Sequence, residues 1–212
     1  MYYDRLEAGM ILAKALKKYQ NDDSVVLAVP RGGIPIAYIV AKELNFPLDI
    51  LLTKKIGHPT NKEYAIGAVS LTDRFIIPHP GVSQMYIDQE TQRIRLRLKE
   101  MYKKFRGDNP PEKLKDKTVI IIDDGIATGN TLMSSIDMLR KAEPTKIIIA
   151  VPVASKSAIE KIEKRVDEII CPLIPEAFFG VGAFYQDFEQ VSDEEVIYYI
   201  HKLAENDHDT PH

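Results

Sequence analysis

The chain has 212 residues, of which 45% are hydrophobic and 28% are charged, and its formal net charge is −3. This balance is typical of a globular protein, and the length predicts one main domain with a substantial core. The negative net charge argues against nucleic-acid binding through bulk basicity. No apolar run approaches the roughly 20 residues that cross a bilayer. Since the N-terminus also lacks the form of a signal peptide, we expect a cytoplasmic protein with no membrane partner.

Cysteine and histidine do not indicate a metal site. Cys171 is the only cysteine, which excludes an internal disulfide and a cysteine-based metal site, and we expect it to end a core strand. The five histidines show no zinc-binding spacing.

In chain order, the first half of the sequence alternates helical and extended patterns. Asp4 and Glu7 have the spacing of a capping box, which predicts that a helix begins there. Hydrophobic periodicity and turn residues then predict the following elements: a helix over 5–19, a strand over 25–29, a helix over 34–44, a strand over 48–53, a polar loop over 54–63, a strand pair over 66–70 and 75–77, and a helix over 84–105.

The second half continues the alternation. Ser192 and Glu195 have the spacing of a second capping box, which begins the last helix. The predicted elements are a strand over 119–122, a helix ending near 141, a strand over 146–151, a helix over 155–164, a strand over 167–171, an irregular aromatic segment over 172–190 and a helix ending near 203.

Strands that alternate with helices predict an α/β fold with a mostly parallel central sheet and helices on both faces. We expect the α/β core to occupy residues 20–171 and the tail over 204–212 to be disordered. Ligands of such sheets bind beyond the carboxyl ends of the strands. This rule brings together the loops over 30–33, 54–63 and 123–130.

The most informative stretch is residues 118–132, TVIIIDDGIATGNTL. A buried strand ends in the adjacent carboxylates Asp123 and Asp124, and a loop of small and hydroxyl residues then opens a helix. Free N–H groups at a helix start bind anions. A ligand with a phosphate, a vicinal diol and Mg²⁺ would suit both the acids and the loop.

Other readings of this stretch fit less well. A P-loop requires Gly-Lys-Ser/Thr, but Asn130 follows Gly129, and the three glycines of a dinucleotide-binding fingerprint are not present. The acids could also simply cap the next helix. The order of apolar run, acid pair and glycine turn favours a ligand site over that alternative.

The stretch resembles the ribose-phosphate loop of the type I phosphoribosyltransferases. The resemblance implies that Asp123 and Asp124 face the ribose diol of phosphoribosyl pyrophosphate (PRPP) and, indirectly, Mg²⁺. It also implies that the 5-phosphate lies in a cradle formed by Gly125, Ile126, Ala127, Thr128, Gly129, Asn130 and Thr131.

A second loop, Pro30-Arg31-Gly32-Gly33, resembles the pyrophosphate loop of the family. Its two glycines allow backbone amides to approach an anion closely. Arg31 can add a bidentate contact to phosphate oxygens. An ordinary strand-to-helix turn is the alternative for these residues.

Lys54 and Lys55 follow a predicted strand and suit contacts with pyrophosphate or a substrate carbonyl, so we count them with the acids as catalytic candidates. The family resemblance implies a mobile lid over residues 54–70, with Gly57 and Gly67 as hinges. Solvated surface lysines are the alternative.

The family also implies a variable hood over the acceptor base, for which residues 1–19 and 172–203 are candidates. Within the second segment, Phe178, Phe179 and Tyr185 could stack on a planar heterocycle or could form a satellite apolar cluster. The basic residues of the helix over 84–105 fit a solvated face better than an RNA-binding one.

One residue departs from the purine-salvage members, which often carry an acid where this chain has Ala127. The segments PRGG, KKIGHP, EYAIGAV and SDEEV resemble an uncharacterised phosphoribosyltransferase-domain branch. We therefore expect an Mg²⁺-dependent enzyme that transfers phosphoribosyl from PRPP to a nucleobase-like acceptor, with a homodimer left open. The alternative is a PRPP- or nucleotide-binding regulator without transferase activity.

Overall fold

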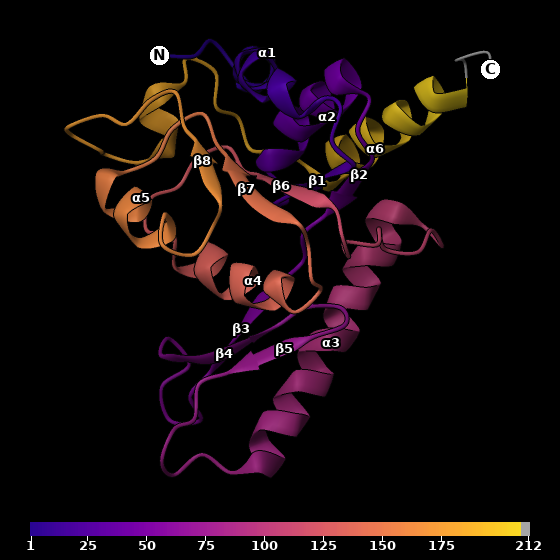
Figure 1. Ribbon diagram of the computed structural model, residues 1–212. Helices are drawn as coiled ribbons and strands as arrows, with labels where there is room; N and C mark the ends of the chain where they lie inside the picture. Colours follow the sequence, from indigo (N-terminus) through magenta and orange to yellow (C-terminus); the bar gives the residue numbers. More distant parts are fainter. Residues whose placement is uncertain (209–212) are drawn as a thin grey trace.

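Five parallel strands form the central sheet in the order β2-β1-β6-β7-β8 (Figure 1). The structure is a computed structural model and describes residues 1–208. The strands are β1 (Ser24–Ala28), β2 (Leu48–Ile50), β6 (Thr118–Ile122), β7 (Lys146–Ala150) and β8 (Glu168–Ile170). The order reverses between β1 and β6, so the loops that follow these two neighbours flank the topological switch point. The predicted parallel sheet is confirmed.

Helices cover both faces of the sheet (Figure 1). On one face lie α1 (Arg5–Leu16), α2 (Gly33–Leu44) and α6 (Asp193–His208), and on the other lie α4 (Asn130–Arg140) and α5 (Lys156–Ile162). Successive strand residues point to opposite faces. Accordingly, Ile120 and Ile122 pack in one hydrophobic cluster, while Val119 and Ile121 pack in the other. The continuous apolar runs of β6 and β7 are therefore those of strands buried on both sides.

A second, antiparallel sheet protrudes beyond α4 and lies beside α3 (Gln84–Arg106) (Figure 1). It consists of β3 (Lys54–Gly57), β4 (Ala65–Val69) and β5 (Arg74–Ile76). The pair β4–β5 was predicted, but residues 54–57 were predicted as loop and are a strand instead. The reason is that Ile56 is buried against the core, and β3 pairs along β4.

The predicted hinge glycines also have another explanation. A Cβ atom at Gly57 would lie 2.3 Å from the carbonyl oxygen of Lys62, and one at Gly67 would lie 2.4 Å from that of Phe75. Both positions therefore require glycine because backbone segments approach closely within the sheet. The lid itself stays a prediction.

Two helix ends differ most from those predicted. The first helix ends at Leu16, and the 3₁₀ turn η1 (Lys17–Tyr19) completes the expected span. At the other end, α6 continues to His208, so the first part of the predicted disordered tail is helical. Residues 209–212 lie outside the described residues.

The N-terminal residues pair with the irregular aromatic segment. The N–H of Tyr2 donates to the carbonyl of Phe184 at 2.8 Å, and the N–H of Gln186 donates to the carbonyl of Tyr2 at 2.9 Å. The aromatic segment contains one 3₁₀ turn, η2 (Val181–Phe184). The two segments proposed as a hood are thus in contact, and their role over an acceptor remains a prediction.

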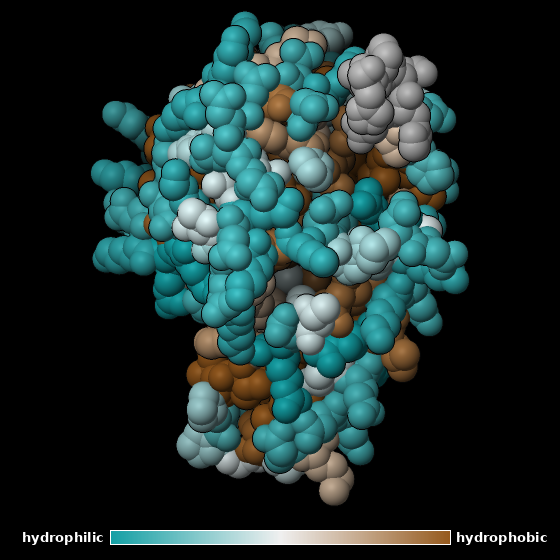
Figure 2. Space-filling view, turned by 45° about the vertical axis from the view of Figure 1, so that its right-hand side comes forward, coloured by the Kyte–Doolittle hydropathy of each residue, from teal (hydrophilic) through white to brown (hydrophobic). Residues whose placement is uncertain are grey.

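Most of the face in Figure 2 is hydrophilic, but apolar side chains gather on its lower, protruding part. The large apolar side chains exposed in the protruding region include Ile77, Met85 and Leu96. Among residues 1–208, no helix has both the length and the apolar character needed to cross a membrane.

Candidate active site

The two predicted ligand loops touch at the switch point. Ala28 at the end of β1 pairs in register with Ile122 at the end of β6. A Cβ atom at Gly32 would lie 1.9 Å from Oδ2 of Asp124, and one at Gly33 would lie 2.5 Å from the carbonyl oxygen of Ile122. Both glycines are therefore required for the loop after β1 to lie against the acids after β6. The peptide bond between Pro30 and Arg31 is cis.

The acid pair lies in a poorly solvated position. Burial raises the pKa of Asp123 well above its ordinary value, and the charge of Asp124 raises it further. Burial also raises the pKa of Asp124, against the opposing effect of Arg5. Oδ1 of Asp123 accepts a hydrogen bond from the N–H of Asp124 at 2.8 Å. A cation or a pair of hydroxyl donors beside these acids would relieve their desolvation.

Arg5 is a site residue that the sequence did not suggest. Its Nη2 and Nε lie 2.9 and 3.1 Å from Oδ2 of Asp124, and its Nη1 donates to the carbonyl of Glu189 at 2.8 Å. The guanidinium lies over the ring of Phe188, 3.9 Å from its centroid. Only 12% of the Arg5 side chain is exposed. No local pattern could reveal this contact, because 119 positions separate Arg5 from Asp124.

A cavity of about 520 Å³ opens beside the acid pair. Its lining includes Arg5, Arg31, Gly32, Asp124 and Phe188. The Nε of Arg31 pairs with Oδ1 of Asp193 at 2.5 Å, and 44% of the Arg31 side chain remains exposed. The cavity thus combines two guanidinium groups, one carboxylate and one aromatic ring, whose face is covered by Arg5.

The three predicted acceptor residues do not line this cavity. Phe178 packs against Phe184 with ring centroids 5.5 Å apart, and the side chain of Phe179 is exposed. Tyr185 is buried, and its hydroxyl donates to the backbone carbonyl of Asp124 at 2.7 Å. Tyr185 therefore positions the acid loop, and Phe188 is the aromatic residue that faces the cavity.

The loop after the acids presents unused N–H groups. In the part of the chain that the structure describes, no acceptor pairs with the N–H groups of Ala127, Thr128, Gly129 and Asn130. Gly129 has a φ of 71° and precedes the first turn of α4. Adjacent N–H groups before a helix start form an anion site. This is the geometry expected of a phosphate cradle.

Two other residues of the predicted cradle have structural roles. The N–H of Ile126 donates to Val153 at 3.0 Å, and its carbonyl accepts from Ser155 at 2.9 Å. A Cβ atom at Gly125 would lie 2.6 Å from Cγ1 of Val181. Both residues shape the loop, whereas the side chain of Thr131 lies outside what the structure describes.

Lys54 and Lys55 lie next to the predicted phosphate cradle rather than beside Arg31. They line a second cavity of about 460 Å³ together with Thr128 and Asn130. The Nζ of Lys55 pairs with Oε2 of Glu63 at 2.8 Å. The structure therefore brings the lysines to the start of α4, and neither lines the cavity that contains Arg31.

The residues present fit a magnesium ion that is shared with substrate. Within residues 1–208, no group of three or more histidine, cysteine or acidic side chains could hold a metal alone. Mg²⁺ commonly binds one or two carboxylates together with substrate phosphates and water. Asp123 and Asp124, with their raised pKa values, are the carboxylates that could share it.

Replacing Gly129 by alanine is expected to weaken phosphate binding about tenfold. A side chain at a φ of 71° is strained by about 1 kcal/mol, and the new Cβ atom would lie 2.9 Å from Cδ1 of Ile162. Both effects would displace the N–H groups. Calorimetric titration with ribose 5-phosphate measures the change. Gly107→Ala is the control, because Gly107 also has a positive φ of 64° but nothing within 4 Å. Equal affinities in the two variants would contradict the cradle.

The model of one protein family, described as "Phosphoribosyl transferase domain", matches residues 2–187. The chain belongs to this family. The match includes both ligand loops and the cavity residues from Arg5 to Val181, and it ends just before Phe188. The family predicted from the motif of residues 118–132 is therefore confirmed.

Similar proteins agree with this assignment. A Mycobacterium tuberculosis protein, whose name gives it provisionally as a phosphoribosyl transferase, is 32% identical over 205 residues. The match covers 94% of this chain but 46% of that protein, so the chain spans about half of its relative's length. The crystal structure of TT1426 from Thermus thermophilus has a TM-score of 0.86 and 35% identity, and the match covers 96% of this chain and 99% of that one. The uracil phosphoribosyltransferase of Mycoplasma genitalium is 31% identical over 96 residues, which cover 45% of this chain and 41% of that protein.

Proposed function

We propose that this phosphoribosyltransferase-family protein transfers the 5-phosphoribosyl group of PRPP to a nitrogenous base and releases pyrophosphate. The observation that carries the proposal is the junction after β6. There, the desolvated acids Asp123 and Asp124 directly precede a loop with free N–H groups. The ribose hydroxyls and the 5-phosphate of PRPP likewise lie next to each other on one molecule.

In this proposal, the two ends of PRPP bind different loops. The N–H groups from Ala127 to Asn130 hold the 5-phosphate. Asp123 and Asp124 accept hydrogen bonds from the ribose hydroxyls. The planar guanidinium of Arg31 donates hydrogen bonds to two oxygens of the pyrophosphate. Mg²⁺, when bound with PRPP, adds positive charge at the pyrophosphate oxygens.

The reaction itself needs no protein nucleophile. A nitrogen lone pair of the base attacks C1 of the ribose, and the bond from C1 to the pyrophosphate oxygen breaks with its electrons leaving on pyrophosphate. Positive charge grows on the ribose during this step, and the carboxylates at its hydroxyls stabilise it. Arg31 stabilises the negative charge that grows on the leaving group. Positioning and electrostatics therefore supply most of the catalysis.

The acceptor would lie in the cavity beside the acids, against the edge of the Phe188 ring, because the guanidinium of Arg5 covers the face of that ring. Ala127 offers no carboxylate to this acceptor. A base that depends on an acid at that position, as in the hypoxanthine- and guanine-using members, is thus a poorer candidate than one that does not.

A regulator that binds PRPP without turnover is the second candidate, and the pair between Arg5 and Asp124 favours it. This pair occupies an acid that the ribose would use. In an enzyme, the ribose hydroxyls must displace Arg5 from the Asp124 carboxylate in every catalytic cycle. In a sensor, this displacement of Arg5 could itself report that PRPP is bound.

The deciding experiment measures pyrophosphate release from PRPP with Mg²⁺ across a panel of nucleobases. The proposal expects release that depends on one base or a few related bases. Calorimetric PRPP binding without release by any base would instead support the regulator, and the absence of both would refute the PRPP site.

Arg31→Ala is expected to weaken pyrophosphate inhibition about tenfold or more, while Lys54→Ala and Lys55→Ala weaken it less. Arg31 lines the cavity beside Asp124, and the lysines line the other one. The inhibition constant of pyrophosphate in the transfer assay measures the effect. The two lysine variants are the controls, because each also removes one positive charge. If a lysine variant shows the larger effect, pyrophosphate binds at the start of α4 and the assignment of the two loops is wrong.

A further inference from the structure

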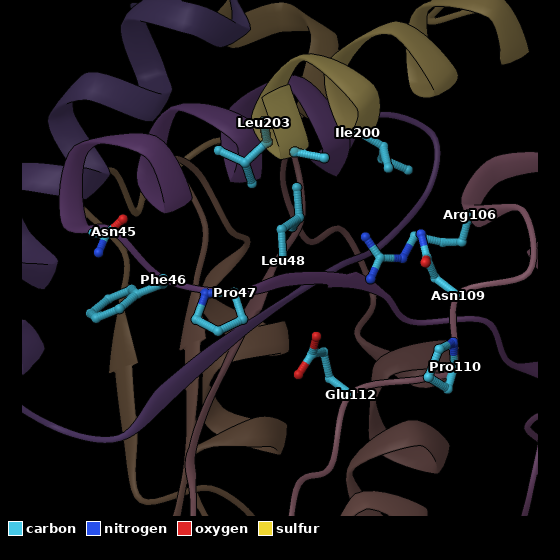
Figure 3. A pocket seen from close by; sticks show the side chains of 11 residues that line it. Asn45, Phe46, Pro47, Leu48, Arg106, Asn109, Pro110, Glu112, Ile200 and Leu203 are labelled. Atoms are coloured by element: carbon cyan, nitrogen blue, oxygen red, sulfur yellow. The ribbon is translucent and has the colours of Figure 1, made fainter. Parts of the chain in front are cut away.

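A third cavity, of about 550 Å³, lies at the opposite end of the central sheet from the acid pair. Leu48 in its lining is the first residue of β2, whereas the acids follow the last residue of β6 in the parallel sheet. Figure 3 shows that Ile200 and Leu203 of α6 project toward this space from above. It shares no lining residue with either cavity described above. The volume is in the range of small-molecule sites.

One wall of this cavity carries a guanidinium with unused donors. The side chain of Arg106, at the end of α3, is 14% exposed, and its Nε lies 3.4 Å from Oδ1 of buried Asp49. That Nε makes no hydrogen bond. Asp49 instead accepts hydrogen bonds from the hydroxyl of Tyr102 at 2.9 Å and the N–H of Glu112 at 2.8 Å. Arg106 is therefore held by the charge of Asp49 and by the hydroxyl of Tyr102, while terminal N–H groups of its fork remain for a ligand.

A carboxylate faces the same space. In Figure 3 the side chains of Glu112 and Arg106 point into the cavity from two sides. Among residues 1–208, no donor or cation pairs with the carboxylate of Glu112. Two helices also end here, since α3 ends at Arg106 and α2 has Asn45 as its C-cap. The carbonyl ends of helices favour a positive group nearby.

The remaining wall is apolar. Leu48, Ile200 and Leu203 present carbon surface on the side of α6 and β2, whereas the ring of Phe46, in the loop before β2, points away from Arg106 and Glu112 (Figure 3). A simple anion would meet Glu112, and a simple cation would meet Arg106. A ligand that satisfies the whole lining needs one group of each sign and an apolar body.

We propose that this cavity binds a free α-amino acid with an apolar side chain. The carboxylate would pair with the fork of Arg106, and the ammonium group would pair with Glu112. The side chain would lie against Leu48, Ile200 and Leu203. The proposal is independent of PRPP chemistry, because none of these residues belongs to the candidate active site.

Calorimetric titration of the full chain tests the class of ligand. The probes are L-leucine and L-phenylalanine, together with phenethylamine, which lacks the carboxylate, and 3-phenylpropionate, which lacks the amine. We expect L-phenylalanine or L-leucine to bind, and each truncated probe to bind at least tenfold more weakly than L-phenylalanine. Failure of both amino acids to bind, or equal binding of a truncated probe, overturns the proposal.

Two variants locate the binding. Glu112→Gln should weaken amino-acid binding at least tenfold, because it keeps the shape and the backbone hydrogen bond to Asp49 but removes the charge. Glu176→Gln is the matched control at an exposed position outside the cavity, and it should bind like the parent. Thermal melting checks that both variants are folded. If Glu112→Gln binds the amino acid as the parent does, the site is elsewhere and the proposal fails.

Discussion

Replacing either Asp123 or Asp124 by asparagine is expected to lower PRPP-dependent pyrophosphate release by about 100-fold or more. Preorganised charges aimed at a developing opposite charge contribute on this scale. Asparagine keeps the shape and the oxygen that accepts the N–H of Asp124, but it removes the negative charge that would stabilise the ribose at the transition state. The fold should survive, because neither acid supports a helix or strand of the core.

Steady-state pyrophosphate release and calorimetric PRPP binding measure this effect, and thermal melting reports whether each variant is folded. Asp108→Asn is the matched control, because Asp108 is exposed and pairs only with Lys103 in the described residues. If both active-site variants bind PRPP as the parent does, the acid pair is not part of the PRPP site.

The same acids are expected to make the free protein less stable as the pH rises above about 4. The ordinary pKa of an aspartate is about 3.9, and burial raises the pKa of Asp123 in the folded state well above that value. Above pH 4 the folded chain therefore binds more protons than the unfolded chain, so the free energy of unfolding falls as the pH rises. Asp123→Asn removes the part of this dependence that comes from Asp123. It should melt at a higher temperature than the parent at pH 7, by a few degrees, because about 1 kcal/mol moves Tm by roughly 2–4 °C at this size.

Melting curves of parent and variant at several values between pH 4 and pH 8 provide the measurement. The difference in Tm should be small at pH 4 and should grow with pH. Asp124→Asn is the comparison, because it also removes an acid with a raised pKa but leaves the guanidinium of Arg5 without its carboxylate. The rise in Tm of Asp124→Asn over the parent should be smaller than that of Asp123→Asn. A difference in Tm that does not change with pH would mean that Asp123 is not desolvated as the structure indicates.

Local patterns predicted most of the elements well because each depends on neighbours along the chain. The capping contacts of Asp4 with Glu7 and of Ser192 with Glu195 join residues three positions apart. The burial of β6 and β7 likewise follows from runs of isoleucine. The strand at residues 54–57 was missed because Lys54 and Lys55 are polar and exposed, and only pairing with β4 makes this segment a strand.

The sequence by itself determined the family, the parallel sheet and the loops that carry Asp123, Asp124, Arg31 and Gly129, because these features are set by residue order within short segments. Tertiary structure decided what surrounds the acids. Arg5 reaches Asp124 across 119 positions, and Tyr185 reaches its carbonyl across 61. It also placed the lysines beside Thr128 rather than beside Arg31. Such contacts depend on how separate elements pack in space, and no periodicity or motif along one segment records that packing.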